Sequence, residues 1–497
     1  MFEKVTPEEV GISSKSILKY LKKLEDAELS VHDVIILRHN KICFEKYWEP
    51  FSADFLHRMY SASKSFIALA IGFLIEDGKI SLDDKIVDLL PEEITEGANE
   101  MVRLQTVRDM LTMQTGHPYC DGGWMARRTD NRLKDYFEHS EGAGKYPGTV
   151  FRYDSPGSFV LSATLEYITG KSFMEYLREK LLDKIGFSKE AYCLKCPGGN
   201  DWTDSGIMCT ARDLMKVATF VMNGGRWGNE QLLSEKFIDE ATSCLVSTNE
   251  TGNKSTHSYG YGYLFWRGQQ NSYFFSGMGS QYAICIPDKD ILFVFNGDSQ
   301  GDALAHTKII DGFFDIVVDS VGNENLPQDT EAEKGLSEYT EGLKLIYMKN
   351  SIKTNFQDLI NGKEYVMSEN PMNITKLKLE FSEDEGKLCY ENASGYKQLP
   401  FGIGENVFSE FPEEGYSDMI GSKKADGNFY KCAVSAAWAE EKKIILNVQI
   451  IDKYFGKLHI VIGFKDENHI TVFMRRAAQD FLSEYEGYAI GKVDEAN

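Results

Sequence analysis

The sequence predicts an α+β protein: one sheet flanked by helices with an inserted helical lobe, followed by a small all-β domain. Three observations lead to this prediction. Strand-forming runs occur before residue 50 and again after residue 259, and mainly helical patterns lie between them. A polar stretch at residues 322–329 separates this part from the rest. From residue 365 to residue 488 the chain consists of short alternating β-runs.

Length and composition are those of a soluble globular protein. A chain of 497 residues exceeds one ordinary core, so two or three domains are expected. Hydrophobic residues make up 42% and charged residues 26% of the chain. The formal net charge of −22 disfavours nucleic acid and anionic membranes as partners, because phosphate binding needs concentrated Lys and Arg.

The cellular location is expected to be cytoplasmic. Residues 1–9 lack the basic and apolar regions of a secretory signal. The longest strongly apolar run, residues 66–75, is about half of what a membrane helix needs. Nine cysteines, an odd number, indicate free thiols. Cys193 and Cys196 form a C-x-x-C pair without a second pair nearby, so we interpret them as incidental.

The first part of the chain begins with a helix at residues 11–29. Two strand runs, 34–37 and 42–48, follow, and Arg38-His39-Asn40-Lys41 between them is a hairpin signal. A buried helix then extends to residue 75 and ends at Glu76-Asp77-Gly78-Lys79, and Ser81 to Asp84 can cap the next helix. Further helical patterns continue to about residue 240, among them 107–112, 158–167 and 211–221.

Strand character returns at residue 259. The expected strands are 259–266, 272–275, 281–286 and 291–296, with a turn at Pro287-Asp288-Lys289-Asp290. A helix over residues 303–318 follows. Because strands from both ends enclose a helical middle, we expect one sheet with an inserted lobe.

Three regions are expected along the chain. The first, residues 1–322, carries the sheet and the lobe. Residues 323–352 form a linker with a helix over about 330–349, and residues 353–497 form a small barrel or sandwich. Its expected strands are 374–381, 387–390, 431–438, 444–450, 457–464 and 470–473.

Ser61-Ala62-Ser63-Lys64 is the most informative motif. If a helix starts at or just before Ser61, positions i and i+3 share one face. A serine hydroxyl becomes a useful nucleophile when a neighbouring base takes its proton, and Lys64 can be that base. S-x-x-K is a signature of serine acyl-transfer enzymes. Taken alone, the motif also fits a helix-capping serine and a snorkelling lysine.

Two further clusters could carry chemistry. Proline and glycine flank Phe151-Arg152-Tyr153-Asp154-Ser155, which places Tyr153 on a loop entering a helix. Phe275-Ser276-Gly277-Met278 lies between two strands, where small residues let a substrate approach the backbone. Taken alone, these clusters also fit a buried aromatic residue and a hairpin turn.

Together, in this order, the three clusters resemble the penicillin-recognising serine hydrolases. That superfamily includes class C β-lactamases, D-alanyl-D-alanine peptidases, esterases and 6-aminohexanoate-dimer hydrolases. The resemblance spans about residues 5–320 and includes stretches typical of the esterase and dimer-hydrolase branch, at residues 76–85, 106–113, 210–214 and 259–263. It implies a β-lactamase-like antiparallel sheet, and the C-terminal domain resembles the lipocalin-like barrels appended to some of these hydrolases.

The resemblance also implies roles. Ser61 is the expected nucleophile, Lys64 the adjacent base, and Tyr153 the proton relay to the leaving group. Ser155 fills the third position of the Y-x-[NS] motif. Phe275, Ser276 and Gly277 stand where the family has Lys-Thr-Gly or His-Thr-Gly, and the backbone N–H groups of Ser61 and Met278 would form the oxyanion hole.

Phe275 is a departure from the family pattern. The family's cation at this position helps to hold a substrate carboxylate, and an aromatic ring cannot do so. The nine histidines show no metal-ligand spacing, so neither a metal nor a cofactor is expected.

The sequence therefore predicts a serine hydrolase that acts on a small ester or amide through a Ser61 acyl-enzyme. A β-lactamase or D-amino-acid peptidase proper is an alternative, as is a transferase. A catalytically idle binding or scaffold relative is an alternative of another class. The physiological substrate, the choice between Lys64 and Tyr153 as base, the role of the β-domain and homo-oligomer formation are left open.

Overall fold

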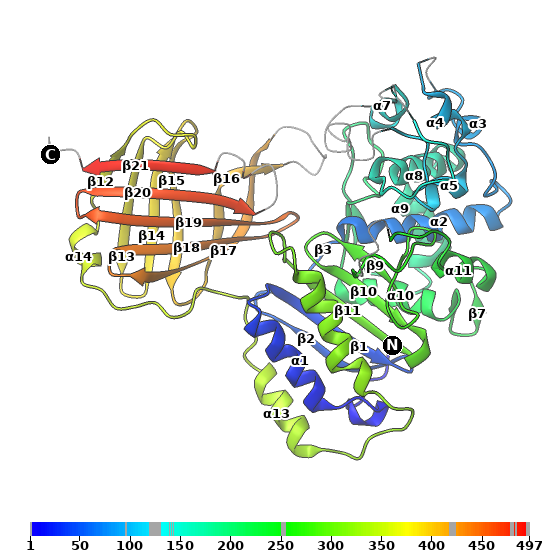
Figure 1. The fold of residues 1–497 in the computed structure, drawn as a ribbon, viewed down its shortest axis with the longest axis horizontal. Coiled ribbons are helices and arrows are strands. Elements are labelled where there is room, and N and C mark those ends of the chain that lie inside the picture. The colour runs from blue at the N-terminus through cyan, green and yellow to red at the C-terminus, as the bar shows by residue number, and fades with distance from the viewer. Residues whose placement is uncertain are drawn as a thin grey trace. The chain divides into compact units, whose positions relative to one another are not determined.

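The computed structural model describes residues 2–94, 97–118, 131–138, 140, 142, 144–249, 255–416, 424–477, 482 and 485–493. Apart from residues 418–422, the chain divides into two compact units (Figure 1). The first comprises Met1–Ser299 and Ala303–Lys344. The second comprises Gln300–Asp302, Leu345–Ser417 and Lys423–Asn497. The predicted domain boundaries at residues 322 and 352 stay predictions.

A six-stranded antiparallel sheet lies at the centre of the first unit, as predicted. Its strand order is β2-β1-β11-β10-β9-β8, so β1 of the N-terminal hairpin pairs directly with β11, a strand more than 200 residues later. His39 and Asn40 adopt positive φ values of 53° and 57° in the turn between β1 and β2. The strands are β1 (Val31–Arg38), β2 (Lys41–Tyr47), β8 (Trp266–Arg267), β9 (Tyr273–Gly277), β10 (Gln281–Ile286) and β11 (Ile291–Gly297).

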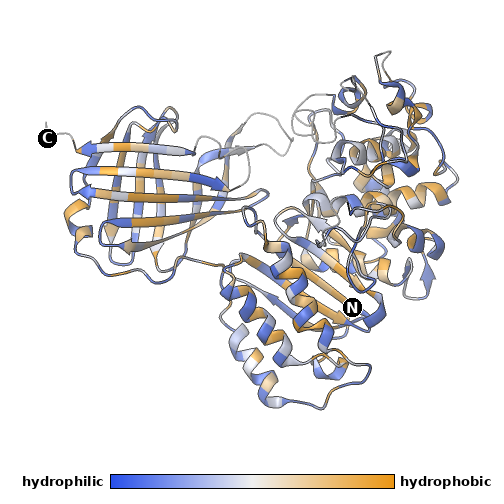
Figure 2. Ribbon diagram, viewed as in Figure 1, coloured by the Kyte–Doolittle hydropathy of each residue, from blue (hydrophilic) through white to orange (hydrophobic). Residues whose placement is uncertain are grey.

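Helices cover both faces of this sheet, which explains its nearly continuous apolar strands (Figure 2). On one face, α1 (Ser14–Asp26) and α12 (Gly312–Ile316) bury Tyr20 and Phe313 against Phe293. The other face carries α2 (Ser63–Glu76) and α10 (Ala211–Met222). All eight residues of β1 are consequently buried.

The predicted helical lobe occupies the middle of the chain. A small sheet of order β3-β5-β4 connects it to the segment before α2. The helix α8 begins at an Asp154 cap, and Thr106 forms a capping box at the start of α5. The lobe contains α3 (Ile86–Leu89), α4 (Glu100–Leu104), α5 (Val107–Leu111), α7 (Arg132–Glu138), α8 (Ser155–Thr169), α9 (Phe173–Leu177), β3 (His57–Arg58), β4 (Tyr192–Cys193) and β5 (Ile207–Cys209); β6 (Arg226–Trp227), β7 (Glu230–Gln231) and α11 (Glu235–Thr242) follow α10.

Three expected elements differ from the structure. The strand expected at 259–266 is reduced to β8, because Leu264 has a positive φ of 57° and Gly262 packs against the Ala241 carbonyl. The helix expected at 303–318 is broken into a π-turn, α12 and a 3₁₀ turn. The helix expected at 330–349 ends early: α13 (Thr330–Thr340) stops two residues before Gly342 and packs on α1.

The second unit is a closed barrel of nine strands in the described residues. Neighbouring strands pair antiparallel, and a short parallel pairing of Gly402 and Ile403 with Ser435 and Ala436 closes the ring. The resemblance to lipocalins stays a prediction. The ring contains β12 (Glu364–Met367), β13 (Lys376–Ser382), β14 (Glu385–Asn392), β15 (Gly395–Ile403), β17 (Lys424–Glu440), β18 (Lys443–Ile451), β19 (Phe455–Asp466), β20 (His469–Ala477) and β21 (Gly487–Val493); β16 (Val407–Tyr416) pairs with β17, and α14 (Phe356–Ile360) precedes β12.

No helix in the described residues combines the length and the apolar character needed to cross a bilayer.

Candidate active site

The predicted serine–lysine pair is formed. A 3₁₀ turn, Tyr60–Ala62, precedes α2, which begins at Ser63. Lys64 Nζ lies 3.0 Å from Ser61 Oγ, within hydrogen-bond distance. The Ser61 side chain is partly exposed, whereas Lys64 is only 1% exposed. A hydroxyl open to solvent is thus held against a buried amine, which is the arrangement that activation of a serine requires.

The backbone around Ser61 is unusual. Tyr60 has a φ of 47°, a conformation that a bulky residue rarely adopts. Its buried ring lies under the Arg58 guanidinium, 4.3 Å from ring centre to Cζ. Strand β9 approaches this turn so closely that a Cβ added to Gly277 would lie 2.1 Å from the Met59 carbonyl oxygen. Only glycine allows β9 to lie against the turn that carries Ser61.

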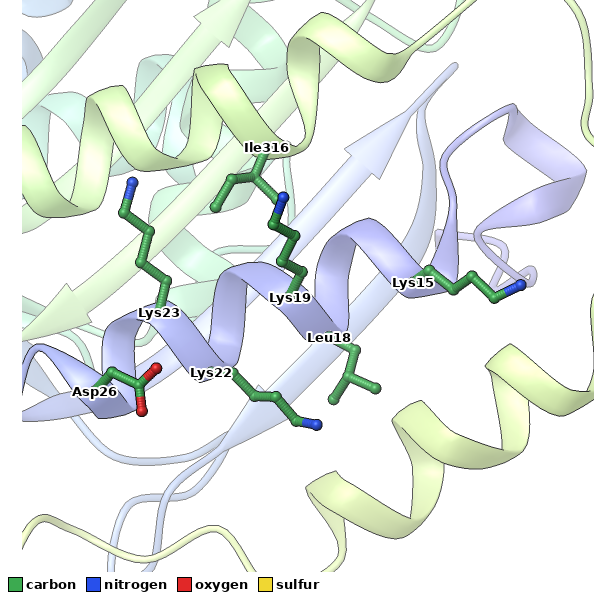
Figure 3. A pocket seen from close by; sticks show the side chains of 7 residues that line it. All are labelled: Lys15, Leu18, Lys19, Lys22, Lys23, Asp26 and Ile316. Atoms are coloured by element: carbon green, nitrogen blue, oxygen red, sulfur yellow. The ribbon is translucent and has the colours of Figure 1, made fainter.

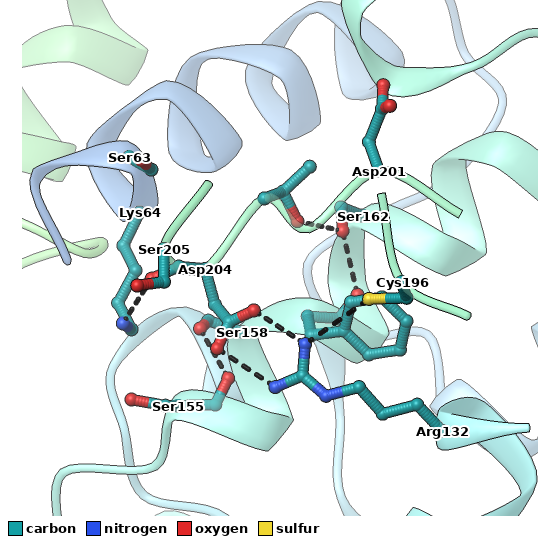
Figure 4. Close-up of polar contacts among 12 residues, drawn as sticks. Ser63, Lys64, Arg132, Ser155, Ser158, Ser162, Cys196, Asp201, Asp204 and Ser205 are labelled. Atoms are coloured by element: carbon teal, nitrogen blue, oxygen red, sulfur yellow. Dashed lines mark hydrogen bonds and ion pairs between the residues drawn. The ribbon is translucent and has the colours of Figure 1, made fainter. Parts of the chain in front are cut away.

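Lys64 is held in place by a second bond. Its Nζ donates to the Asp204 carbonyl at 2.7 Å. The Asp204 carboxylate in turn accepts two bonds from the Arg132 guanidinium, at 2.7 and 2.9 Å (Figure 4). Both partners of this ion pair are buried. Burial opposes the charge of Arg132, but the Asp204 carboxylate outweighs burial and raises the pKa of the guanidinium.

A second buried arginine fixes the next residue of the same loop. Arg58 Nε donates to the Ser205 carbonyl at 2.9 Å, and a second guanidinium nitrogen donates to the Ser205 hydroxyl at 3.1 Å. The segment 204–205 that positions Lys64 is therefore held on both sides by buried hydrogen bonds.

Tyr153 lies beside Lys64. Lys64 Nζ is 5.1 Å from the centre of the Tyr153 ring, which stacks on Trp266 at 5.7 Å and 16°. The following residue, Asp154, is fully buried and caps α8 by accepting the Gly157 N–H at 2.9 Å and the Thr115 hydroxyl at 2.7 Å. The prediction that Tyr153 sits on a loop entering a helix is confirmed.

Ser155 is the first residue of α8 and is partly exposed. Its carbonyl accepts a bond from the Ser158 hydroxyl at 2.7 Å, and its side chain is drawn with Lys64 and Asp204 in Figure 4.

The third cluster ends strand β9. Ser276 is partly exposed and Met278 is 37% exposed, in a turn where Gly279 and Ser280 both have a φ of 77°. Phe275 points the other way: it is fully buried, and its ring contacts Phe66 of α2 and Phe265, with centres 6.1 and 5.1 Å apart. In the structure its ring belongs to the core and not to an open surface.

Several residues of this region carry no recognisable sequence signal. Arg132 and Asp204 are 72 positions apart and belong to no motif. His257, whose Nε2 lies 3.4 Å from Ser276 Oγ, sits on a loop, and Trp266 is one of several aromatic residues there. Only the folded chain brings these side chains together.

Cys196 lies close to this site, and its Sγ accepts a bond from the Arg132 guanidinium at 3.8 Å. Among the residues that the structure describes, no three His, Cys, Asp or Glu side chains gather in a way that could hold a metal ion. Burial raises the pKa of the Cys196 thiol to about 11, although Arg132 lowers it in part.

A separate hollow of about 450 Å³ lies along α1 (Figure 3). Its lining consists of Lys15, Leu18, Lys19, Lys22, Lys23, Asp26 and Ile316. The lysine side chains spread to either side of the helix, and none of the lining residues is a serine, cysteine or histidine.

The antiparallel sheet, the inserted helical lobe and the Ser–Lys pair at the start of a buried helix are features of β-lactamase-like proteins. A family model described as Beta-lactamase matches residues 27–310, more than half of the chain. The chain belongs to this family, which confirms the resemblance seen in the sequence.

Individual relatives are distant. The 6-aminohexanoate-dimer hydrolase of Paenarthrobacter ureafaciens is 25% identical over 248 residues, which cover 47% of this chain and 63% of that protein. The chain thus spans less than two thirds of that relative. A Bacillus anthracis structure provisionally named a 6-aminohexanoate-dimer hydrolase has a TM-score of 0.53 at 20% identity and covers 66% of this chain and 89% of its own. A structure named SurE, at 15% identity and a TM-score of 0.50, covers 97% of this chain and 98% of its own. These structural likenesses show the fold alone.

Proposed function

We propose that the protein is a serine hydrolase that cleaves small esters or amides through an acyl-enzyme on Ser61. One observation carries this proposal: the partly exposed Ser61 hydroxyl lies 3.0 Å from a buried amine that a carbonyl fixes from behind. A capping serine or a snorkelling lysine would not need this arrangement, because each would direct its polar group to a helix end or to water.

The proposed reaction has two halves. Lys64 takes the Ser61 proton as Oγ attacks the substrate carbonyl, and the backbone N–H groups of Ser61 and Met278 stabilise the oxyanion. Such donors contribute about 3–4 kcal/mol in the transition state. Tyr153 then passes a proton to the leaving alcohol or amine, and water releases the acid. The contact between Lys64 and Ser61 favours Lys64 as the first base, with Tyr153 as the alternative.

The proposed substrates are small, uncharged esters or linear amides. A relative named 6-aminohexanoate-dimer hydrolase supports amide cleavage. The ring of Phe275 lies in the core, so position 275 offers a substrate carboxylate no cation. We expect hydrolysis of nitrophenyl acetate or butyrate with a higher kcat/KM than that of nitrocefin. The reverse order would favour a β-lactamase proper.

Labelling by a fluorophosphonate tests the site. We expect rapid covalent labelling of the intact protein, and loss of labelling together with a fall of at least ~10³ in kcat for Ser61→Ala. Ser63→Ala is the matched control, because the Ser63 hydroxyl accepts a bond from the Ile207 N–H and is expected to serve structure alone. Labelling that persists in Ser61→Ala would refute the assignment, and an inert parent protein would favour the idle scaffold.

The remaining expectations accompany this proposal as predictions. They are a lipocalin-like barrel with a packing or self-association role, and a cytoplasmic location.

A further inference from the structure

A histidine outside the three motifs contacts both walls of the candidate site. His257 Nε2 lies 3.4 Å from Ser276 Oγ on β9. The same imidazole makes a T-shaped contact with Trp266, with ring centres 4.4 Å apart at 75°, and Trp266 stacks on Tyr153. Since Ser276 directly precedes the glycine that packs against the Ser61 turn, His257 lies next to the reacting groups without belonging to them.

The backbone that carries His257 is firmly held. Ser255 and Ser258 close a turn around it through reciprocal bonds of 2.8 Å. The Thr248 hydroxyl donates to the His257 carbonyl at 2.6 Å. The backbone of His257 is therefore held by contacts within the chain.

The groups around His257 are both polar and aromatic: Ser276 Oγ, the His306 imidazole and the rings of Trp266 and Phe274. Burial, with a smaller contribution from His306, lowers the pKa of His257 to about 3. The His306 ring lies 5.0 Å away at 88°, and its Nδ1 contacts the hydroxyl of Tyr282, the residue opposite Ser276 in the sheet. Two imidazoles and two hydroxyls thus gather on the sheet face opposite Phe275.

We propose that His257 and Ser276 form a neutral hydrogen-bonding subsite that selects substrates with an uncharged polar group, such as a carboxamide, over substrates with a carboxylate. This inference rests on the proposed hydrolase function. A neutral imidazole can donate to or accept from a carboxamide. A carboxylate gains no ionic partner from His257 or Ser276, whereas charge-assisted bonds to a cation would strengthen its binding about tenfold to a hundredfold.

Two isosteric substrates test the subsite: the 4-nitrophenyl monoesters of adipic acid and of adipamic acid, which differ only in a terminal carboxylate or carboxamide. We expect the intact protein to prefer the carboxamide by at least about tenfold in kcat/KM. His257→Lys should move this ratio toward the carboxylate by about tenfold or more, mainly through KM. His257→Gln keeps a neutral donor and acceptor and should retain the preference.

A further pair of variants tests the subsite in case the His257→Lys protein does not fold. His257→Phe and Ser276→Ala should each raise KM for the carboxamide substrate more than KM for nitrophenyl hexanoate, and the two effects should be non-additive when combined. Unchanged KM values in variants that still react with the fluorophosphonate would overturn the subsite while leaving the proposed function intact. A parent protein that neither hydrolyses esters nor reacts with the probe would instead defeat the proposed function and the inference together.

Discussion

The Lys64 amine is held in place because the residue that accepts its hydrogen bond, Asp204, belongs to a buried ion pair. Asp204 holds the amine through its carbonyl, and its carboxylate is held by Arg132 in a pair with almost no exposure to water. Removing one partner of such a pair leaves a buried charge that nothing compensates. The consequence reaches Lys64, because the carbonyl that accepts a hydrogen bond from its amine belongs to the same residue.

Arg132→Met is therefore expected to destabilise the protein by about 3–5 kcal/mol and to lower kcat. Combining it with Asp204→Asn should restore much of the stability, because the stranded carboxylate is then neutral. Urea unfolding measures both effects. Lys134→Met on the same helix is the control: its i,i+4 pair with Glu138 is half exposed and contributes about 0.5 kcal/mol or less. Equal effects of the two single substitutions would contradict the importance of the buried pair.

The substitution Tyr153→Phe removes only the phenol hydroxyl and so tests the role of that group. The ring should keep its stacking on Trp266, so the melting temperature is expected to stay unchanged. Acylation should slow by about 10²–10⁴, the usual contribution of a positioned acid or base, as measured by the burst of nitrophenol release. Tyr167→Phe, on the exposed side of α8, is the control. Parent-like acylation in Tyr153→Phe would leave Lys64 as the sole acid and base.

The sequence predicts the positions of some site residues but not of others. The Ser61–Lys64 contact follows from i,i+3 spacing within one helical turn, and the position of Tyr153 follows from its Pro and Gly neighbours. Arg132, Asp204 and His257 act through contacts between distant segments, which no local pattern encodes. Strand alternation separates Phe275 from Ser276, but the sequence does not say which face α2 covers.

Among the elements, β9 and the 3₁₀ turn that carries Ser61 lie in close contact. Gly277→Ala would place a methyl group 2.1 Å from the Met59 carbonyl oxygen, so one of the two backbones must move. We expect a loss of about 1–3 kcal/mol and a strong fall in turnover.

Gly463→Ala is the matched control, because a Cβ there has nothing within 4 Å and the backbone is extended. Its stability, measured by thermal unfolding, should be unchanged or slightly raised. A folded, fully active Gly277→Ala protein would show that activity does not depend on the close approach of β9 to the Ser61 turn.

Helices and strands were predicted correctly where they bury one face or all of their faces. The central strands and the long helices follow their apolar patterns. In the second unit, β12, β15, β16 and β21 were not predicted, because their exposed positions carry aromatic or charged residues and because Pro400 and Pro412 lie inside β15 and β16. Barrel strands depend on cross-strand neighbours, which a local pattern does not contain.

At the scale of the whole molecule, α13 belongs to the first unit although it follows the expected boundary. Leu336 is buried in the core around α1, and the Tyr339 hydroxyl donates to Glu25 at 2.6 Å. A chain ending at Lys344 should therefore keep fluorophosphonate labelling at Ser61. A chain ending at Leu326 should lose about 2–4 kcal/mol, because the burial of Ala332 and Leu336 is lost.

Thermal unfolding and labelling of the two shortened proteins provide the comparison. Equal stability would show that α13 is dispensable. Loss of labelling in both proteins would show that the second unit is needed for a working site.

The pairing of β1 with β11 has a consequence for synthesis. β1 is buried on both faces and pairs with residues 291–297, roughly 260 residues later in the chain. A ribosome adding about 5–20 residues per second needs roughly 13–50 s to reach them, whereas a hairpin forms within about 10 μs. During that interval the nascent β1–β2 hairpin presents an apolar strand with an open edge. The emerging polypeptide is therefore a natural client for chaperones that shield such strands until β11 arrives.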